Sequence, residues 1–127
     1  MSLTQPASHV VFDLDSLQAL RFSRPRDMVS LQRFTHRFGY EAAHLEQLCR
    51  LKPGMAHENP FHARLQHFMR VALDVVAWRM LSVPDLDRAI EWFKHELIAS
   101  QGDRTPEQIV ADGDQRALLK APGDRPN

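Results

Sequence analysis

Residues 60–82, PFHARLQHFMRVALDVVAWRMLS, decide the fold, because they form the longest run of apolar side chains with a helical period. The residues that keep this period are Phe61, Leu65, Phe68, Met69, Ala72, Val76 and Met80. Leu73, Val75 and Trp78 widen the apolar surface beyond a single packing face. The sequence therefore predicts a long helix that is covered on more than one side.

Shorter helices are expected after this one. Ser82 and Pro84 are typical of a helix start, and the apolar stripe that follows comprises Leu86, Ala89, Ile90, Phe93 and Leu97. After a turn at residues 100–103, Thr105 and Gln108 have the spacing of a capping box, with Pro106 at the first helical position. Asp114 is a candidate cap for a last helical segment that carries two leucines, Leu118 and Leu119.

Two helices are expected before residue 60, at 28–38 and 41–51, separated by Gly39. Asp27 is the candidate cap of the first, and Gly39 suits a left-handed residue at its end. The apolar positions of the pair are Leu31, Phe34, Phe38, Leu45 and Leu48. This spacing fits the helix-turn-helix pattern at most of its marked positions, although Thr35 stands where a small alanine is usual.

These elements predict an all-α, compact bundle of six or seven helices with a helix-turn-helix-like pair and a small C-terminal helical region. The expected organisation is an N-terminal arm with a short helix at 1–26, the helix-turn-helix region at 27–59, a helical domain at 60–120 and a mobile tail at 121–127.

Composition points to a cytoplasmic protein of one ordinary domain. The chain has 127 residues, a formal net charge of zero and a single cysteine, which excludes an internal disulfide. No signal peptide or membrane span is expected from the sequence. Residues 1–80 are mildly basic and residues 81–127 mildly acidic.

An enzyme finds no support in these motifs. There is no glycine-rich phosphate loop and no G-x-S-x-G nucleophile motif. His57, His62 and His67 recur every five residues, which turns them away from a common helical face and from a shared metal. We therefore expect no catalytic residue, no metal and no cofactor.

DNA contact is one of two interpretations of the pair around Gly39. Arg33 and Arg37 are the candidates for phosphate contacts, and His44 and Gln47 for contacts to bases. Glu41 and Glu46 on the same face would repel phosphate. The alternative interpretation is two packed core helices with a solvated, charged outer face.

The final third of the chain carries a family resemblance. AIEWF at 89–93, RTPEQIVADG at 104–113 and the leucine-bearing segment that follows resemble the toxin-binding domain of the Xre/MbcA/ParS antitoxins over roughly residues 60–120. The matching positions are Ala89, Ile90, Trp92, Phe93, Leu97, Gly102, Thr105, Pro106, Ile109, Val110 and Gly113. The pair around Gly39 resembles the Xre-like half of the same family. Here a single glycine precedes Thr-Pro, where members often have two.

The resemblance implies an antitoxin that neutralises a RES-type toxin, which consumes or modifies NAD, by covering its active-site cleft, and that in some members also represses its operon. The candidate toxin-binding residues are Trp92, Arg116, Leu118, Leu119, Lys120 and Arg125. Trp92 is either a partly exposed anchor or part of a second core layer against Trp78. The breadth of the apolar surface at 60–82 also predicts a homodimer or a hetero-oligomer with the toxin. The alternatives are a stand-alone helix-turn-helix repressor that binds operator DNA, and a helical adaptor.

Overall fold

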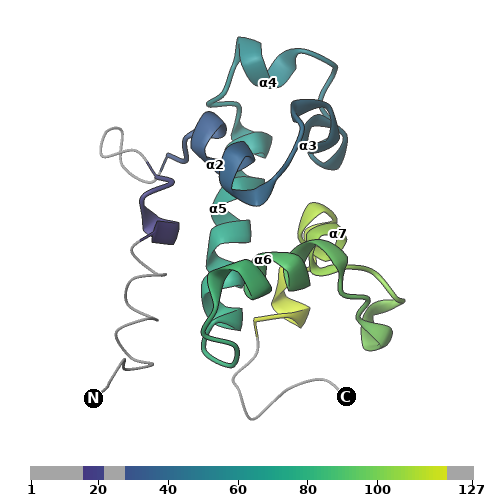
Figure 1. The fold of residues 1–127 in the computed structure, drawn as a ribbon. Coiled ribbons are helices and arrows are strands. Elements are labelled where there is room, and N and C mark those ends of the chain that lie inside the picture. The colour runs from purple at the N-terminus through teal and green to yellow at the C-terminus, as the bar shows by residue number, and fades with distance from the viewer. Residues whose placement is uncertain (1–15, 22–27, 120–127) are drawn as a thin grey trace, which may run out of the picture.

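The computed structural model describes residues 16–21 and 28–119, and these residues form helices without a single strand. The α-helices are α2 (Leu31–Phe38), α3 (Ala42–Leu48), α4 (Met55–Glu58), α5 (Ala63–Arg79), α6 (Leu86–His95) and α7 (Pro106–Ala111), and the 3-10 turns are η1 (Ala99–Gln101) and η2 (Gln115–Ala117). The predicted all-α class is confirmed. Figure 1 shows α5 as the axis, with α2, α3 and α4 around its first half, α6 beside its second half and α7 next to α6.

Helix α5 is central because its apolar residues are covered on more than one side, as the sequence predicts. Its fully or almost fully buried apolar residues are Leu65, Phe68, Met69, Ala72, Leu73, Val75 and Val76. The helix starts later than expected, because the ring of His62 accepts a hydrogen bond from the backbone N–H of Arg64 and caps it at Ala63. Phe61, expected in the helix, precedes it and is 48% exposed.

Helices α6 and α7 pack on α5 and on each other. The expected stripe of α6 is buried from Leu86 to Phe93, but its last member is wrong: α6 ends at His95 and Leu97 is 61% exposed. The Asp85 side chain caps α6 by accepting the backbone N–H of Arg88 at 3.1 Å. The capping box of Thr105 and Gln108 forms as predicted at the start of α7.

Helices α2 and α3 flank Gly39, whose φ of 73° is the left-handed conformation expected of it. Helix α2 starts three residues later than predicted, because Ser30 is its cap: the Ser30 hydroxyl accepts the backbone N–H of Arg33 at 3.2 Å. Asp27, the expected cap, lies outside the described residues. Where a plain connection was expected, Met55–Glu58 form the short helix α4.

A buried amide helps to tie the segment before α2 to α5. The Gln66 side chain accepts the backbone N–H of Val29 at 2.8 Å and donates to the Val29 carbonyl at 2.9 Å and to the Pro60 carbonyl at 2.9 Å. Gln66 is 1% exposed, so these bonds satisfy an amide that would be costly to bury alone. Residues 16–18 are helical, consistent with the short N-terminal helix, while residues 1–15 and 22–26 of the predicted arm and the tail at 121–127 lie outside the described residues.

Within the described ranges, no helix has both the length and the apolar character needed to cross a membrane.

Candidate partner-binding surfaces

Trp92, the candidate anchor, is half-buried on α6 and packs against Trp78 of α5, with ring centroids 6.4 Å apart. The Arg79 guanidinium lies 4.9 Å from the centre of the Trp92 ring, within range of a cation–π contact. Both contacts, Trp78 and Arg79, belong to α5. The geometry therefore favours a place for Trp92 in a second core layer over an exposed anchor.

The other candidate toxin-binding residues divide into an inward and an outward set. Leu118, although a candidate toxin-binding residue, is 4% exposed and belongs to the core. This segment forms the 3-10 turn η2, and Asp114 makes no side-chain cap there. Arg116 is exposed and Leu119 is 39% exposed. Lys120 and Arg125 lie outside the described residues.

Arg37 and His44, two of the candidate DNA-binding residues, lie beside carboxylates of this chain. Arg37 forms an ion pair with Asp87 of α6 at 2.9 Å. The His44 Nε2 lies 3.5 Å from a carboxylate oxygen of Glu107. Arg33 donates to the carbonyls of Ala19 and Arg21 at 3.3 and 3.5 Å, and Gln47 is exposed on α3. The four residues are therefore not equally available to a phosphate backbone.

Glu46 is not on the outer face of α3, where the sequence analysis placed it. It is 5% exposed, and its carboxylate accepts the backbone N–H of Ala56 at 2.9 Å. Ala56 lies in the first turn of α4, so the carboxylate satisfies one of the amides that a helix start leaves free. A glutamate ten residues before its partner, in a four-residue helix that was not predicted, gives no periodic signal, which is why this contact was missed.

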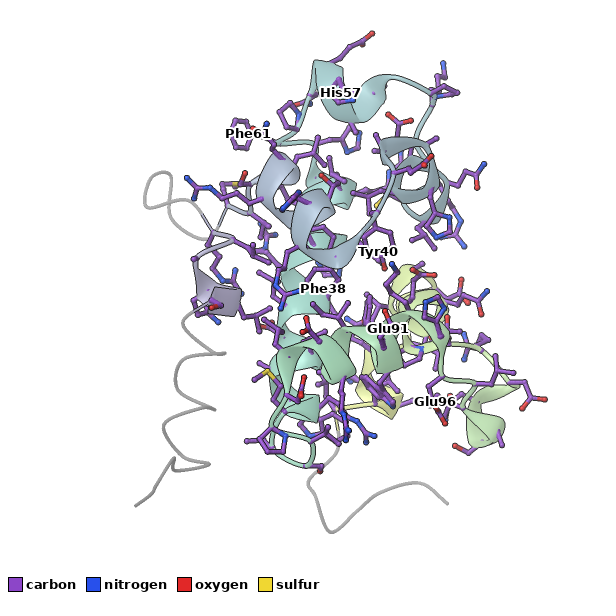
Figure 2. The ribbon with its side chains drawn as sticks, viewed as in Figure 1. Phe38, Tyr40, His57, Phe61, Glu91 and Glu96 are labelled. Atoms are coloured by element: carbon purple, nitrogen blue, oxygen red, sulfur yellow. The ribbon has the colours of Figure 1, made fainter. Side chains whose placement is uncertain are left out.

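A buried polar cluster joins the α2–α3 turn to α6 and α7. The Tyr40 hydroxyl donates a 2.5 Å hydrogen bond to Glu107 of α7, and the rings of Tyr40 and His44 stack with centroids 5.7 Å apart. Lys94 of α6 donates to the Phe38 carbonyl at 2.8 Å. Burial, with Glu107 beside it, raises the pKa of Tyr40 far above its ordinary value. Figure 2 shows Tyr40 and Phe38 where the α2–α3 turn meets the second half of the molecule.

A groove lies where the ends of α3 and α7 meet the start of α5, and we call it the Arg50 groove. It consists of two hollows of about 370 and 340 Å³ that share four residues, Leu48, Arg50, Ala111 and Asp112. Arg104 and Gln108 line the first hollow, and Arg64, His67 and Phe68 line the second. The sequence analysis did not identify it, because its residues come from three separate parts of the chain.

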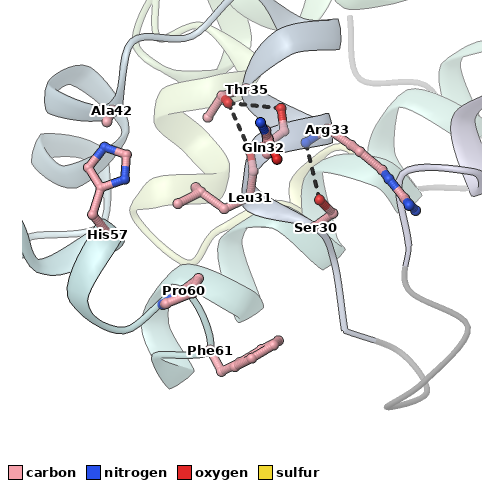
Figure 3. Close-up of a pocket in the computed structure, with 9 residues that line it drawn as sticks. All are labelled: Ser30, Leu31, Gln32, Arg33, Thr35, Ala42, His57, Pro60 and Phe61. Carbon is pink, nitrogen blue, oxygen red and sulfur yellow. Dashed lines mark hydrogen bonds between the residues drawn. The ribbon is translucent and has the colours of Figure 1, made fainter.

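A larger hollow of about 480 Å³ lies between α2, the start of α3, α4 and the residues before α5 (Figure 3). Its apolar lining comes from Leu31, Ala42, Pro60 and Phe61. Of the candidate site residues that the structure describes, only Arg33 borders it. The described residues contain no group of three histidine, cysteine or acidic side chains placed to hold a metal ion.

Comparisons with protein-family models, curated proteins and solved structures find no match to this chain.

Proposed function

We propose that this chain is the antitoxin of a toxin–antitoxin pair and neutralises a RES-type, NAD-consuming toxin. The proposal rests on the resemblance of residues 60–120 to the Xre/MbcA/ParS toxin-binding domain. Its main structural support is the start of α7, where Thr105, Pro106 and Gln108 form the capping box that is the most specific part of that resemblance. Helices α5, α6 and α7 also pack against one another as one unit.

The surface that would face the toxin continues from η2. Arg116 and Leu119 are its outward residues, and the chain continues with Lys120 and Arg125, whose charges suit an NAD-recognising cleft. Leu118 acts differently, as the residue that holds this segment to the core.

A truncation tests this proposal if it removes the tail and leaves the core residues in place. A chain that ends at Leu119 keeps Leu118 buried and loses Lys120 and Arg125, whereas a chain that ends at Gly113 would also lose a core residue. Co-expression of the toxin encoded beside this gene with the full chain should restore growth, and the chain ending at Leu119 should restore it less. A full chain that gives no rescue and forms no complex with that toxin contradicts the proposed function. Rescue by both chains would show that residues 120–127 do not block the cleft.

A stand-alone DNA-binding repressor is the second candidate. It is favoured by the left-handed Gly39 between α2 and α3 and by the exposure of Gln47 on α3. If it is correct, Arg33→Ala should weaken binding to the chain's own upstream DNA across sequences and reduce its salt dependence, while Gln47→Ala should change sequence preference. No band shift at low salt, with and without the toxin, would remove this candidate.

A further inference from the structure

Arg50 has a backbone conformation that normally calls for glycine. It follows α3, where the N–H of Arg50 bonds to the Gln47 carbonyl at 3.1 Å and the N–H of Leu51 bonds to the Glu46 carbonyl at 2.8 Å. These two bonds form a Schellman ending, and its left-handed position is most often glycine. Arg50 occupies it with a φ of 58°. A side chain in this conformation is strained, and strain of this kind is often found at functional positions.

The contacts of the Arg50 side chain within the chain are weak. Its guanidinium lies 3.3 Å from the Ala111 carbonyl and 3.4 Å from the Asp112 carboxylate, and its side chain is 67% exposed. Such exposed, long contacts contribute little to stability. Intramolecular bonding therefore does not account for an arginine at this strained position.

The charges of the Arg50 groove leave an excess of cation. Arg104 donates to Asp112 and to Asp114 at 2.9 Å each, so both carboxylates already have a close guanidinium. Arg64 donates to the Arg50 carbonyl at 3.0 Å, and no carboxylate of the described residues forms an ion pair with it. Three arginines thus face two aspartates, and Arg50 and Arg64 have donors to spare for an incoming anion.

The residues that line the groove indicate which kind of anion it would bind. Beside the two arginines, the second hollow has apolar walls from Leu48, Phe68 and Val110. A carboxylate next to an apolar side chain matches this arrangement. A continuous phosphate backbone matches it less well, because Asp112 and Asp114 stand at the same site and would repel the next phosphates.

We propose that the Arg50 groove binds an acidic segment of a partner protein, in which a glutamate or aspartate that pairs with Arg50 and Arg64 adjoins an apolar side chain. The two guanidinium groups bind the carboxylate, and the apolar neighbour enters the hollow beside Phe68. This surface is distinct from the segment after η2. The inference does not depend on the partner being a toxin.

The test uses the full chain, labelled with ¹⁵N, and three probes: a blocked Glu-Leu-Glu-Leu peptide, its Gln-Leu-Gln-Leu counterpart and hexathymidylate. The glutamate peptide should shift the amide signals of Gln47, Arg50 and Gln108, and added salt should weaken its binding. Arg50→Gly and Arg64→Gln should each weaken binding about tenfold, the loss expected for one charge-assisted pair. Arg88→Gln, which removes an exposed arginine of α6, is the matched control and should bind as the parent does.

Arg50→Gly also separates binding from stability. Glycine relieves the strained φ, so this variant should melt at the same temperature as the parent or higher while it binds the peptide less well. Equal binding of the glutamine peptide, tighter binding of hexathymidylate, or undiminished binding by both arginine variants would overturn the proposal.

Discussion

Tyr40 is a single residue that connects two groups of helices, α2 to α4 on one side and α6 and α7 on the other. Its ring stacks with those of Phe34 and Phe38, while its hydroxyl reaches Glu107 of α7. A buried carboxylate needs hydrogen-bond donors, and the Glu107 side chain is only 9% exposed. Tyr40 thus contributes apolar contact to one group and a hydrogen bond to the other.

Alkaline titration of Tyr40 is the first prediction. Burial and the nearby Glu107 raise the pKa of Tyr40, so the folded protein holds this proton more tightly than the unfolded chain does. The resulting stabilisation is complete below pH 10 and is lost as the pH rises above that value. Absorbance at 295 nm reports on this residue alone, because the chain has one tyrosine. It should stay flat through pH 10 in the folded protein and change near pH 10 in guanidinium; an ordinary titration curve in the folded protein would contradict the contact.

Tyr40→Phe should lower the free energy of unfolding by about 1–3 kcal/mol, because the ring remains while Glu107 loses a donor. Urea unfolding followed by circular dichroism measures this loss. In Tyr40→Phe/Glu107→Gln the carboxylate is gone, so the two changes should cost less together than the sum of the single variants.

The thiol of Cys49 is the subject of a further prediction. Burial raises its pKa to about 12, although the charge of Arg64 opposes this shift. The thiol is therefore protonated near pH 8, and its reaction with dithiobis-nitrobenzoate should be far slower than that of the same cysteine in the unfolded chain. Folded and unfolded rates of similar size would show that Cys49 is accessible.

Helix α7 shows at the element scale how a short helix depends on its ends. Six residues are too few to be stable alone, so the cap and the buried side chains, among them Ile109 and Val110, hold it in place. Thr105→Ala should lower the free energy of unfolding by about 1 kcal/mol, as measured in urea. Thr105→Ser keeps the hydroxyl and is the matched control. Equal losses in the two variants would show that the methyl group, rather than the cap, stabilises α7.

The elements that could be predicted from sequence are those with local signals. The capping box of α7 and the left-handed Gly39 rest on a few adjacent residues, and both are confirmed. The predicted start of α2 was wrong because Ser30 and Asp27 are both residue types that cap helices well, and the hydrogen bond of Val29 to the distant Gln66, next to the Ser30 cap, leaves no local signal. The predicted burial of Leu97 was wrong because the helical period of apolar residues continues in the sequence past His95, where the helix itself ends.

The whole molecule depends on contacts that no local pattern reveals. The Arg50 groove and the Tyr40–Glu107 bond join residues that are distant in sequence. The buried Glu46 bonds to a helix that was not predicted. Helix α5 is a further case. Its broad apolar surface was the reason to expect a homodimer, yet Leu73 and Val75 are buried within one chain, so that reason no longer applies.

Gln66 provides the prediction at this scale. Gln66→Leu keeps the size of the side chain but leaves the N–H of Val29 and the carbonyls of Val29 and Pro60 without their partner. The free energy of unfolding should fall by about 2–4 kcal/mol, because several backbone groups stay buried and unsatisfied. Gln108→Leu, an exposed glutamine whose side chain accepts a single N–H, should cost less. A smaller loss for Gln66→Leu would show that the segment before α2 is not held by this amide.

The Trp78–Trp92 pair determines which part of this protein tryptophan fluorescence reports on. Both tryptophans of the chain lie on α5 and α6, and the nearby Arg79 cation makes their emission sensitive to the packing of these two helices. Helices α2, α3 and α4 contain no tryptophan, so their loss would hardly change the emission while the helical ellipticity fell. Emission and ellipticity that follow the same curve in urea would therefore mean that both groups of helices unfold as one cooperative unit.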